Sequence, residues 1–212
     1  MEQRRFAIIG HRVPASGEVF LNDLAGGSGR LDVLCRAINT ALFVSHGIRQ
    51  DTHMTLHLLG GEGPPRRIWF DGSELRGVRV DERAIAGYIA KVLLRPIPVL
   101  GQWPTVSPGI RHSSGGLGET IADWQREGVE LFALSADAPA MWSREGKLEN
   151  EKRDYGRIGF FLSDDQPFSD DETDLLAQHC SLRSFGKEWF QGHVVIALVH
   201  QLLDLGVELN LD

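Results

Sequence analysis

The sequence predicts an α/β fold with a mostly parallel sheet flanked by helices. Short β-like runs alternate with helical patterns along the whole chain, which is the order typical of a parallel sheet with crossover helices. The chain has 212 residues, of which 42% are hydrophobic and 24% are charged. This length and composition are ordinary for a globular protein, so we expect one domain over residues 1–212.

The alternation sets the predicted elements in order. Strands are expected near residues 5–9, 52–59, 67–70, 129–135, 158–163 and 180–184. Helices are expected near residues 31–46, 81–94, 119–127, 169–178 and 191–205. Two stretches fit neither pattern. Residues 96–118 hold four prolines and five glycines and predict a long loop, and residues 141–155 predict a solvated connection.

Local signals support several helix ends. Ser169 and Glu172 form a capping box at the start of one helix, and Asp81 is a cap for another. Gly128 is expected to end the helix near 119–127. The glycines of Gly115-Gly116-Leu117-Gly118 lack the Lys-Ser/Thr of a phosphate loop, so a turn before a helix is the favoured interpretation.

The helix near residues 31–46 carries an apolar stripe on one side and charges on the other. The stripe consists of Leu31, Leu34, Cys35, Ile38, Leu42 and Ser45, and the other side carries Arg30, Asp32, Arg36 and Asn39. A core helix with a solvated charged face explains this pattern. The preceding glycines, Gly26, Gly27 and Gly29, also favour an anion near the helix start, because free N–H groups lie there.

Charge and cysteine usage exclude some classes of protein. The net charge of −7 argues against broad nucleic-acid coating, although residues 49–95 hold eight basic residues against six acidic ones. Cys35 is expected to be buried and reduced, and no Cys/His cluster has zinc spacing. His53 and His57 are expected in a strand with a structural role. With no signal-peptide pattern and no membrane span, we expect a cytoplasmic protein without a metal.

The carboxyl ends of three predicted strands lead into polar or small residues. These are Leu134-Ser135, Ser163-Asp164-Asp165 and Ser184-Phe185-Gly186-Lys187. Ligands bind beyond the carboxyl ends of strands in open α/β sheets. The three segments therefore predict a ligand site, with ordinary turns as the alternative.

Specific motifs make the sequence similar to a known family. They are Gly29-Arg30-Leu31-Asp32-Val33-Leu34-Cys35-Arg36, Ser45-His46-Gly47-Ile48-Arg49-Gln50-Asp51, Gly72-Ser73-Glu74-Leu75, Asp81-Glu82-Arg83 and Ser107-Pro108-Gly109-Ile110, with Ser184-Phe185-Gly186 and the segment 195–204 near the end. The chain resembles the TrmY family of SPOUT-class RNA methyltransferases. That family methylates N1 of a pseudouridine in the tRNA T-loop, at position 54.

The resemblance implies a SPOUT-like fold with a C-terminal trefoil knot, about residues 129–212, and a homodimer. The apolar helix near 194–205 independently favours burial against a partner. The resemblance also implies S-adenosylmethionine as cofactor, bound at Leu134, Ser163, Asp164, Ser184, Phe185, Gly186 and Val195. The sequence departs from the family's pattern at Asp165, Gln166, Pro167, Lys187 and Val195.

Methyl transfer to a ring nitrogen requires groups that hold the base and stabilise its developing charge. Arg30 and Arg36 are the candidates for this role, while Asp32 would orient Arg30, act as a base or cap the helix. Arg49 and Arg83 are candidates for RNA phosphates. The alternatives to a tRNA methyltransferase are a catalytically silent RNA-binding relative of the fold and a methyltransferase with a different target.

Overall fold

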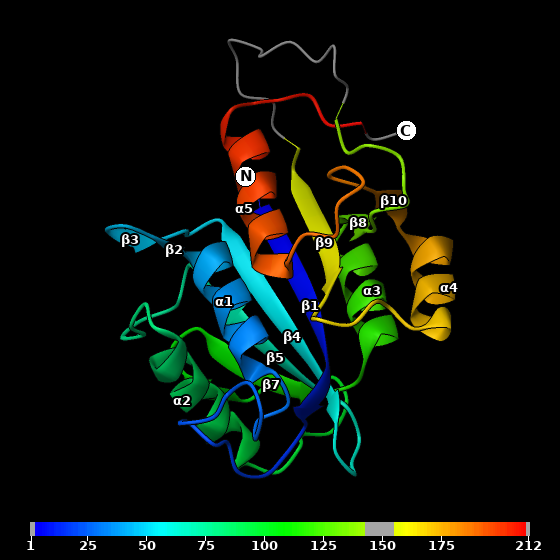
Figure 1. The fold of residues 1–212 in the computed structure, drawn as a ribbon. Coiled ribbons are helices and arrows are strands. Elements are labelled where there is room, and N and C mark those ends of the chain that lie inside the picture. Colours follow the sequence, from blue (N-terminus) through cyan, green and yellow to red (C-terminus); the bar gives the residue numbers. More distant parts are fainter. Residues whose placement is uncertain (1–2, 143–154, 211–212) are drawn as a thin grey trace.

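The computed structural model describes residues 3–142 and 155–210, and within them one large sheet runs through the molecule (Figure 1). Its strand order is β10-β8-β9-β1-β4-β5-β7-β6. The strands are β1 (Gln3–Pro14), β4 (Thr52–Gly60), β5 (Arg66–Asp71), β6 (Thr105–Ser107), β7 (Ile110–Ser114), β8 (Glu130–Leu134), β9 (Arg157–Ser163) and β10 (Ser181–Arg183). From β10 to β4 all pairings are parallel, and from β4 to β6 they are antiparallel. This confirms the predicted α/β fold with a mostly parallel sheet.

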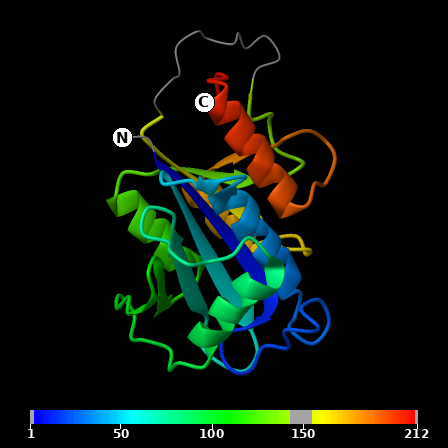
Figure 2. The same cartoon turned by 90° about the vertical axis from the view of Figure 1, so that its left-hand side faces the viewer.

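Helices cover both faces of the sheet. One face carries α1 (Leu31–Leu42), α2 (Glu82–Leu93) and α5 (Gly192–Asp204), and the other carries α3 (Leu117–Arg126) and α4 (Asp170–His179) (Figures 1 and 2). The central strand β1 supplies both cores because its side chains alternate between the faces. Phe6 and Ile8 belong to the core under α1, whereas Ala7 and Ile9 belong to the core under α3.

The last helix does not stay at the edge of the sheet from which it starts. It follows β10, an edge strand, but α5 packs beside α1 over the centre of the sheet (Figure 1). A Cβ added at Gly192 would lie 3.4 Å from the carbonyl oxygen of Ser163, so the start of α5 lies close to the end of β9. The return of the chain therefore brings β9 and the segment after β10 together.

The predicted helix over residues 31–46 is too long. It ends at Leu42, and Phe43 already has extended backbone with φ −106° and ψ 140°. Residues 43–48 instead form a small hairpin of β2 (Phe43–Val44) and β3 (Gly47–Ile48). Ser45, which the spacing placed on the buried stripe, is exposed in the turn.

The proline- and glycine-rich stretch 96–118 is also more ordered than predicted. It contains β6 and β7, and β7 pairs along β5. The turn between them depends on Gly109, which has a φ of 73° and lies against the backbone of Leu75. Pairing with β5 organises this stretch, and no local sequence signal shows that pairing.

The helix-end signals predicted at Asp81, Gly128 and Ser169 are confirmed. The side chain of Asp81 accepts a hydrogen bond from the backbone N–H of Ala84, and Ser169 and Glu172 form the capping box. Gly128, with a φ of 70°, follows the end of α3, and Gly116 caps its start. Most of the predicted connection 141–155 lies outside the described residues. Among the described residues, no helix is long and apolar enough to cross a membrane.

Candidate active site

The first turns of α1 gather the three charged residues that the sequence singled out. Asp32 is buried and accepts hydrogen bonds from both arginines. Arg30 donates through Nε and Nη2, at 3.0 and 3.2 Å, and Arg36 donates through Nη2 at 2.7 Å. The structure therefore brings Arg30, Asp32 and Arg36 into one cluster, with the carboxylate between two guanidinium groups.

The sequence left three roles open for Asp32: orienting Arg30, acting as a base or capping the helix. Burial alone would raise the pKa of Asp32, but hydrogen bonds from Arg30 and Arg36 outweigh this effect and leave the pKa below its ordinary value. A carboxylate with a low pKa is a weak base. The Asp32 side chain also makes no helix-capping hydrogen bond, so its geometry is that of a group that orients Arg30.

A second carboxylate, Asp165, joins this cluster from the loop after β9. Arg30 Nη1 donates to Asp165 Oδ2 at 2.9 Å, and Arg12 at the end of β1 forms an ion pair with the same oxygen atom. The sequence had marked Asp165 as a departure from the family's pattern and gave it no role. Since its partners lie more than 130 residues away along the chain, no local signal could have identified them.

The backbone that presents Arg30 is unusual. Arg30 has a φ of 70°, and it is the one non-glycine residue with positive φ in the described ranges. The left-handed region costs an ordinary residue about 1 kcal/mol or more. Before it, Gly29 lies against β1, because an added Cβ would be 2.2 Å from the carbonyl oxygen of Arg12. The N–H groups of Gly26 and Gly27, expected to favour an anion, donate to the carboxylate of Asp23.

Five of the seven predicted cofactor residues line a small cavity at the carboxyl ends of β8 and β10. Its volume is about 60 Å³. These five residues are Leu134, Ser184, Phe185, Gly186 and Val195. Trp189 and Phe190 also line it, and both have exposed side chains. The cavity is therefore mainly apolar, with main chain on several sides.

The other two predicted cofactor residues, Ser163 and Asp164, lie at the end of β9, outside this cavity. The Ser163 hydroxyl donates to the carbonyl oxygen of Gln166, which closes the turn. Asp164 is bound by His11 and precedes Asp165, the partner of Arg30. The loop after β9 thus contacts the charged cluster, while the loop after β10 forms the cavity.

His193, at the start of α5, connects the two regions, and the sequence reasoning missed it. Burial lowers the pKa of His193, and the positive charge of Arg36 lowers it further, so the imidazole is neutral at pH 7. Its Nδ1 atom is buried without a hydrogen-bond partner, and so is Arg36 Nε. Buried polar atoms without partners are rare in folded proteins. Each of these two atoms therefore has an unused capacity for a hydrogen bond.

The two predicted phosphate-binding arginines lie in different surroundings. Arg49 forms an ion pair with Asp204 at 2.7 Å, and Asp204 also pairs with the buried Arg4 near the start of β1. Arg83 is exposed on α2. Because Arg36 on α1 lies 3.6 Å from Glu82, the start of α2 is next to the charged cluster, whereas Arg49 is at the opposite end of β1.

Only some of the eight basic residues of segment 49–95 are exposed. Arg66 and Arg67 are buried, the first donating to the carbonyl oxygens of Val92 and Arg95. The exposed basic residues gather on and around α2; they are Arg76, Arg79, Arg83, Lys91 and Arg95. The buried, reduced Cys35 and the strand positions of His53 and His57 are as predicted. No group of three potential metal ligands occurs among the described residues.

The chain is similar to known proteins over almost its whole length. Residues 3–206 match the family described as "Putative SAM-dependent RNA methyltransferase". Two similar proteins named tRNA (pseudouridine(54)-N(1))-methyltransferase come from Haloarcula marismortui and Haloferax volcanii. Each is 36% identical over 203 residues, covering 95% of this chain and 96% of the relative. A relative of the same name from Methanosarcina mazei is 33% identical, over 95% of this chain and 90% of its own length.

A solved structure shares the fold. It is Archaeoglobus fulgidus Nep1 bound to S-adenosylhomocysteine, with a TM-score of 0.62 and 12% identity. The match covers 97% of this chain and 99% of that one. Because the family match spans almost the whole chain and the relatives exceed 30% identity, this protein belongs to the TrmY family of RNA methyltransferases.

Proposed function

We propose that this protein transfers a methyl group from S-adenosylmethionine to N1 of pseudouridine 54 in the T-loop of tRNA. Family membership supports the reaction class. The cluster around Asp32 is the observation from which we place the methyl-transfer site in the molecule. Two guanidinium groups flank Asp32, and one of them also contacts the loop after β9 through Asp165. Within the described ranges, Arg36 Nε and, at the start of α5, His193 Nδ1 have no hydrogen-bond partner.

The cavity at Leu134, Phe185 and Val195 fits the adenine end of the cofactor by its chemistry. Flat apolar side chains form its walls, and a Cβ added at Gly186 would meet no heavy atom within 4 Å, so the main chain there is open to a ligand. Since the volume is about 60 Å³, the exposed segment with Trp189 and Phe190 must move outward for a whole nucleoside to enter. When bound, S-adenosylmethionine supplies an activated methyl group on a sulfonium.

The residues around Asp32 have the chemistry to hold the acceptor base. Methylation of pseudouridine exchanges the N1 proton for a methyl group, and the carbon–sulfur bond of the donor would break to leave a neutral thioether. Because N1 gives up its proton as the new bond forms, negative charge develops on the ring and its oxygens. Asp32 fixes the plane of the Arg30 guanidinium. Three of its five N–H groups bond to Asp32 and Asp165, and two remain for the uracil oxygens. The neutral imidazole of His193 supplies an acceptor for the proton.

The exposed basic surface around α2 supports an RNA substrate. It lies beside the start of α1, because Arg36 is close to Glu82, and it includes Arg83. Arginine and lysine contacts to phosphates position RNA without reading its sequence. We propose that this surface, rather than the paired Arg49, carries the phosphate contacts.

We also propose the finer features of the fold that the family implies. The path from the edge strand β10 to α5, whose start lies against Ser163, supports a trefoil knot formed by residues 129–212. The outward stripe of α5 consists of Val194, Ala197, Leu198, Gln201 and Leu205, and supports a homodimer through this helix. A tRNA-modifying role supports a cytoplasmic location.

The decisive experiment uses two transcripts of the same tRNA, one with pseudouridine and one with uridine at position 54. In uridine, N1 carries the sugar and has no proton to lose, so only the pseudouridine transcript is expected to accept a methyl group. Nucleoside mass spectrometry of the product identifies N1-methylpseudouridine. Calorimetry with S-adenosylmethionine, which measures binding without turnover, accompanies it.

Each outcome separates the alternatives. Cofactor binding without methylation of any RNA from the source cells would indicate a silent RNA-binding relative. Methylation at another nucleotide, detected by comparing nucleosides from parent and deletion strains, would indicate a different target. Absence of cofactor binding would contradict the proposal.

A further inference from the structure

A larger cavity lies on the opposite face of the sheet from α1, away from the cluster around Asp32. Its volume is about 350 Å³, within the range of small-molecule sites. Arg5, on β1, lines this cavity. Arg12, at the other end of the same strand, contacts Asp165 in the candidate active site. At about 3.3 Å per residue, the two ends of β1 are separated by roughly 20 Å, so the cavity is a separate place in the molecule.

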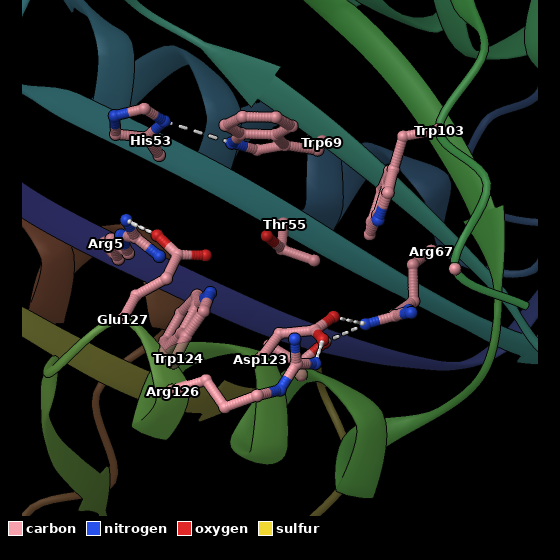
Figure 3. Close-up of a pocket in the computed structure, with 12 residues that line it drawn as sticks. Arg5, His53, Thr55, Arg67, Trp69, Trp103, Asp123, Trp124, Arg126 and Glu127 are labelled. Carbon is pink, nitrogen blue, oxygen red and sulfur yellow. Dashed lines mark hydrogen bonds and ion pairs between the residues drawn. The ribbon is translucent and has the colours of Figure 1, made fainter.

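The fold leaves this cavity because α3 covers only part of the sheet face. Strand register brings Arg5 next to His53 and places Thr55 opposite Trp69, so these side chains share the face. The floor is therefore formed by β1, β4 and β5. The side walls come from α3 and from the loop before β6, which contributes Trp103 (Figure 3).

Three tryptophans surround the open space. Trp69 stacks on His53 with ring centroids 5.4 Å apart, and it donates an indole N–H to His53 Nδ1 at 3.1 Å. Trp103 meets Trp69 edge to face at 6.0 Å, while Trp124 lies on the α3 side (Figure 3). The guanidinium groups of Arg67 and Arg5 lie over the rings of Trp103 and Trp124, at 4.8 and 6.0 Å from the ring centroids. Aromatic rings and guanidinium planes both favour a flat ligand that can stack.

The charged groups of the cavity are already paired with each other. Arg5 bonds to Glu127 at 2.5 Å, and Arg67 bonds to Asp123 at 2.8 Å. Because each guanidinium has a carboxylate beside it, the interior does not favour a compact anion or cation. It offers hydrogen-bond donors and acceptors side by side, which suits an uncharged ring with both kinds of group on its edge.

Further donors in the cavity have no protein partner. The hydroxyl of Thr55 and the indole N–H groups of Trp103 and Trp124 make no hydrogen bond within the described residues. Thr55 is only 4% exposed and lies on the floor. The rim carries Arg126, whose side chain is 74% exposed and could meet a phosphate.

From these observations we infer that this cavity binds a nucleobase, stacked beside Trp103 and the guanidinium of Arg67 with its edge toward Thr55. The base comes either from a free nucleotide or from an unpaired residue of the RNA substrate. The second source rests on the proposed function. In that case the base is not the methylated one, since the cavity and the Asp32 cluster lie on different faces.

The first test is calorimetry of the full-length protein with AMP, GMP, CMP and UMP, and with ribose 5-phosphate as the control without a base. At least one nucleotide is expected to bind, and ribose 5-phosphate is not. Trp103→Ala removes one stacking wall and should weaken nucleotide binding at least tenfold, whereas Trp103→Phe should stay within about threefold of the parent. Val99→Ala is the matched control, because Val99 is 70% exposed in the same loop and does not line the cavity.

The second test measures the KM for a pseudouridine-containing tRNA with the same variants. A raised KM for Trp103→Ala, with weak binding of free nucleotides, would indicate a base of the RNA. Tight binding of a free nucleotide with an unchanged KM would indicate that the free nucleotide is the ligand. If Trp103→Ala does not fold, Thr55→Val removes the floor hydroxyl while keeping the side-chain shape, and it should weaken binding about threefold or more.

The inference is wrong if no nucleotide binds and if Trp103→Ala and Val99→Ala have the same KM for RNA. That outcome leaves the proposed function intact when the parent still methylates the RNA. The opposite outcome is also distinguishable. If the parent binds nucleotides at this cavity but neither binds S-adenosylmethionine nor methylates RNA, the inference is supported and the proposed function is contradicted.

Discussion

His11 and Asp164 are joined twice, once through the main chain and once through the side chain of His11. The backbone N–H of His11 donates to Asp164 Oδ2 at 2.9 Å, and the ring atom Nδ1 lies 2.9 Å from Asp164 Oδ1. The other ring nitrogen, Nε2, lies 3.0 Å from Glu172 Oε2. The imidazole thus fastens the loop after β9 to β1 and to α4, and with it the neighbouring Asp165 that contacts Arg30.

The first prediction concerns the pH dependence of stability. Hydrogen bonds to Asp164 and Glu172 raise the pKa of His11 from 6.5 to about 9. Between these values the folded protein holds a proton that the unfolded chain releases, so this contribution is complete below pH 6.5 and is lost as the pH rises through 9. We expect His11→Gln to lower the free energy of unfolding by about 1–3 kcal/mol at pH 6 and by much less at pH 10.

Urea unfolding of parent and variant at pH 6, 8 and 10 measures this difference. His46→Gln is the control, because His46 is exposed in the turn between β2 and β3. A difference between parent and His11→Gln that stays constant across these pH values would mean that His11 is not charged in the folded protein.

The second prediction concerns Arg30. Arg30→Ala should lower methylation of pseudouridine-containing RNA at least about tenfold, which corresponds to about 1.4 kcal/mol of transition-state stabilisation, while S-adenosylmethionine affinity stays within about threefold. Loss of the ion pairs to Asp32 and Asp165 should reduce the free energy of unfolding by about 1 kcal/mol or less, since Arg30 is partly exposed. Arg30→Lys should not restore the rate, because an ammonium cannot hold both oxygens of Asp32.

Single-turnover kinetics, calorimetry and thermal unfolding separate these effects. An unchanged rate in Arg30→Ala would contradict the role of Arg30 in holding the base. A cation at a helix start is by itself mildly unfavourable because of the helix dipole. The two carboxylates of Asp32 and Asp165 offset this effect, because both bond to the guanidinium.

The sequence identified the elements whose patterns are long and periodic. The stripe of α1 and the caps at Asp81 and Ser169 depend on residues close together in the chain, and they are found as expected except for Ser45, which lies beyond the end of α1. The cluster of Arg30, Asp32 and Arg36 was also within reach, because about two helix turns contain it.

Apart from the hairpin of β2 and β3, whose pairing is local, the features discussed next depend on partners distant in the sequence. β7 is a strand because it pairs with β5, and Arg67 is buried because Asp123 neutralises it from α3. Asp165 gains its place from Arg12 and Arg30 on two other elements. The apolar content of a helix or strand can be read locally, but the partner of a buried charge cannot.

The third prediction concerns Gly186 in the proposed cofactor cavity. Its φ is 121°, and an added Cβ would meet no protein atom within 4 Å, so Gly186→Val is expected to strain the loop and fill space meant for the ligand. We expect at least a tenfold loss of S-adenosylmethionine affinity by calorimetry. Gly17 is the matched control, with a φ of 104° and equally open surroundings outside the cavity.

Gly17→Val carries similar backbone strain without entering the cavity, so this variant should bind S-adenosylmethionine as tightly as the parent does. Gly60 would not serve as the control, because a Cβ there would lie 2.4 Å from the carbonyl oxygen of Arg12. If Gly186→Val and Gly17→Val lose the same amount of S-adenosylmethionine affinity, the proposal that the cofactor binds in this cavity is wrong.

The fourth prediction concerns the outward stripe of α5. Ile196, Val199 and Leu203 face the core, which leaves Leu198 and Leu205 on the other side of the helix, where Leu205 is 48% exposed. An apolar stripe on an exposed helix is stabilised by covering it, so the protein should be a dimer at micromolar concentration. Leu198→Asp would place a charge in that interface and should raise the dissociation constant at least tenfold, or about 1.4 kcal/mol.

Light scattering between 1 and 100 μM, a range chosen to bracket roughly micromolar dissociation, measures the mass of each protein. Leu94→Asp is the matched control, because Leu94 is also exposed, at 69%, but lies after α2. If α5 forms the interface, Leu94→Asp remains a dimer while Leu198→Asp dissociates. A parent that is monomeric throughout would contradict the homodimer, and a dimer that withstands Leu198→Asp would place the interface on another face.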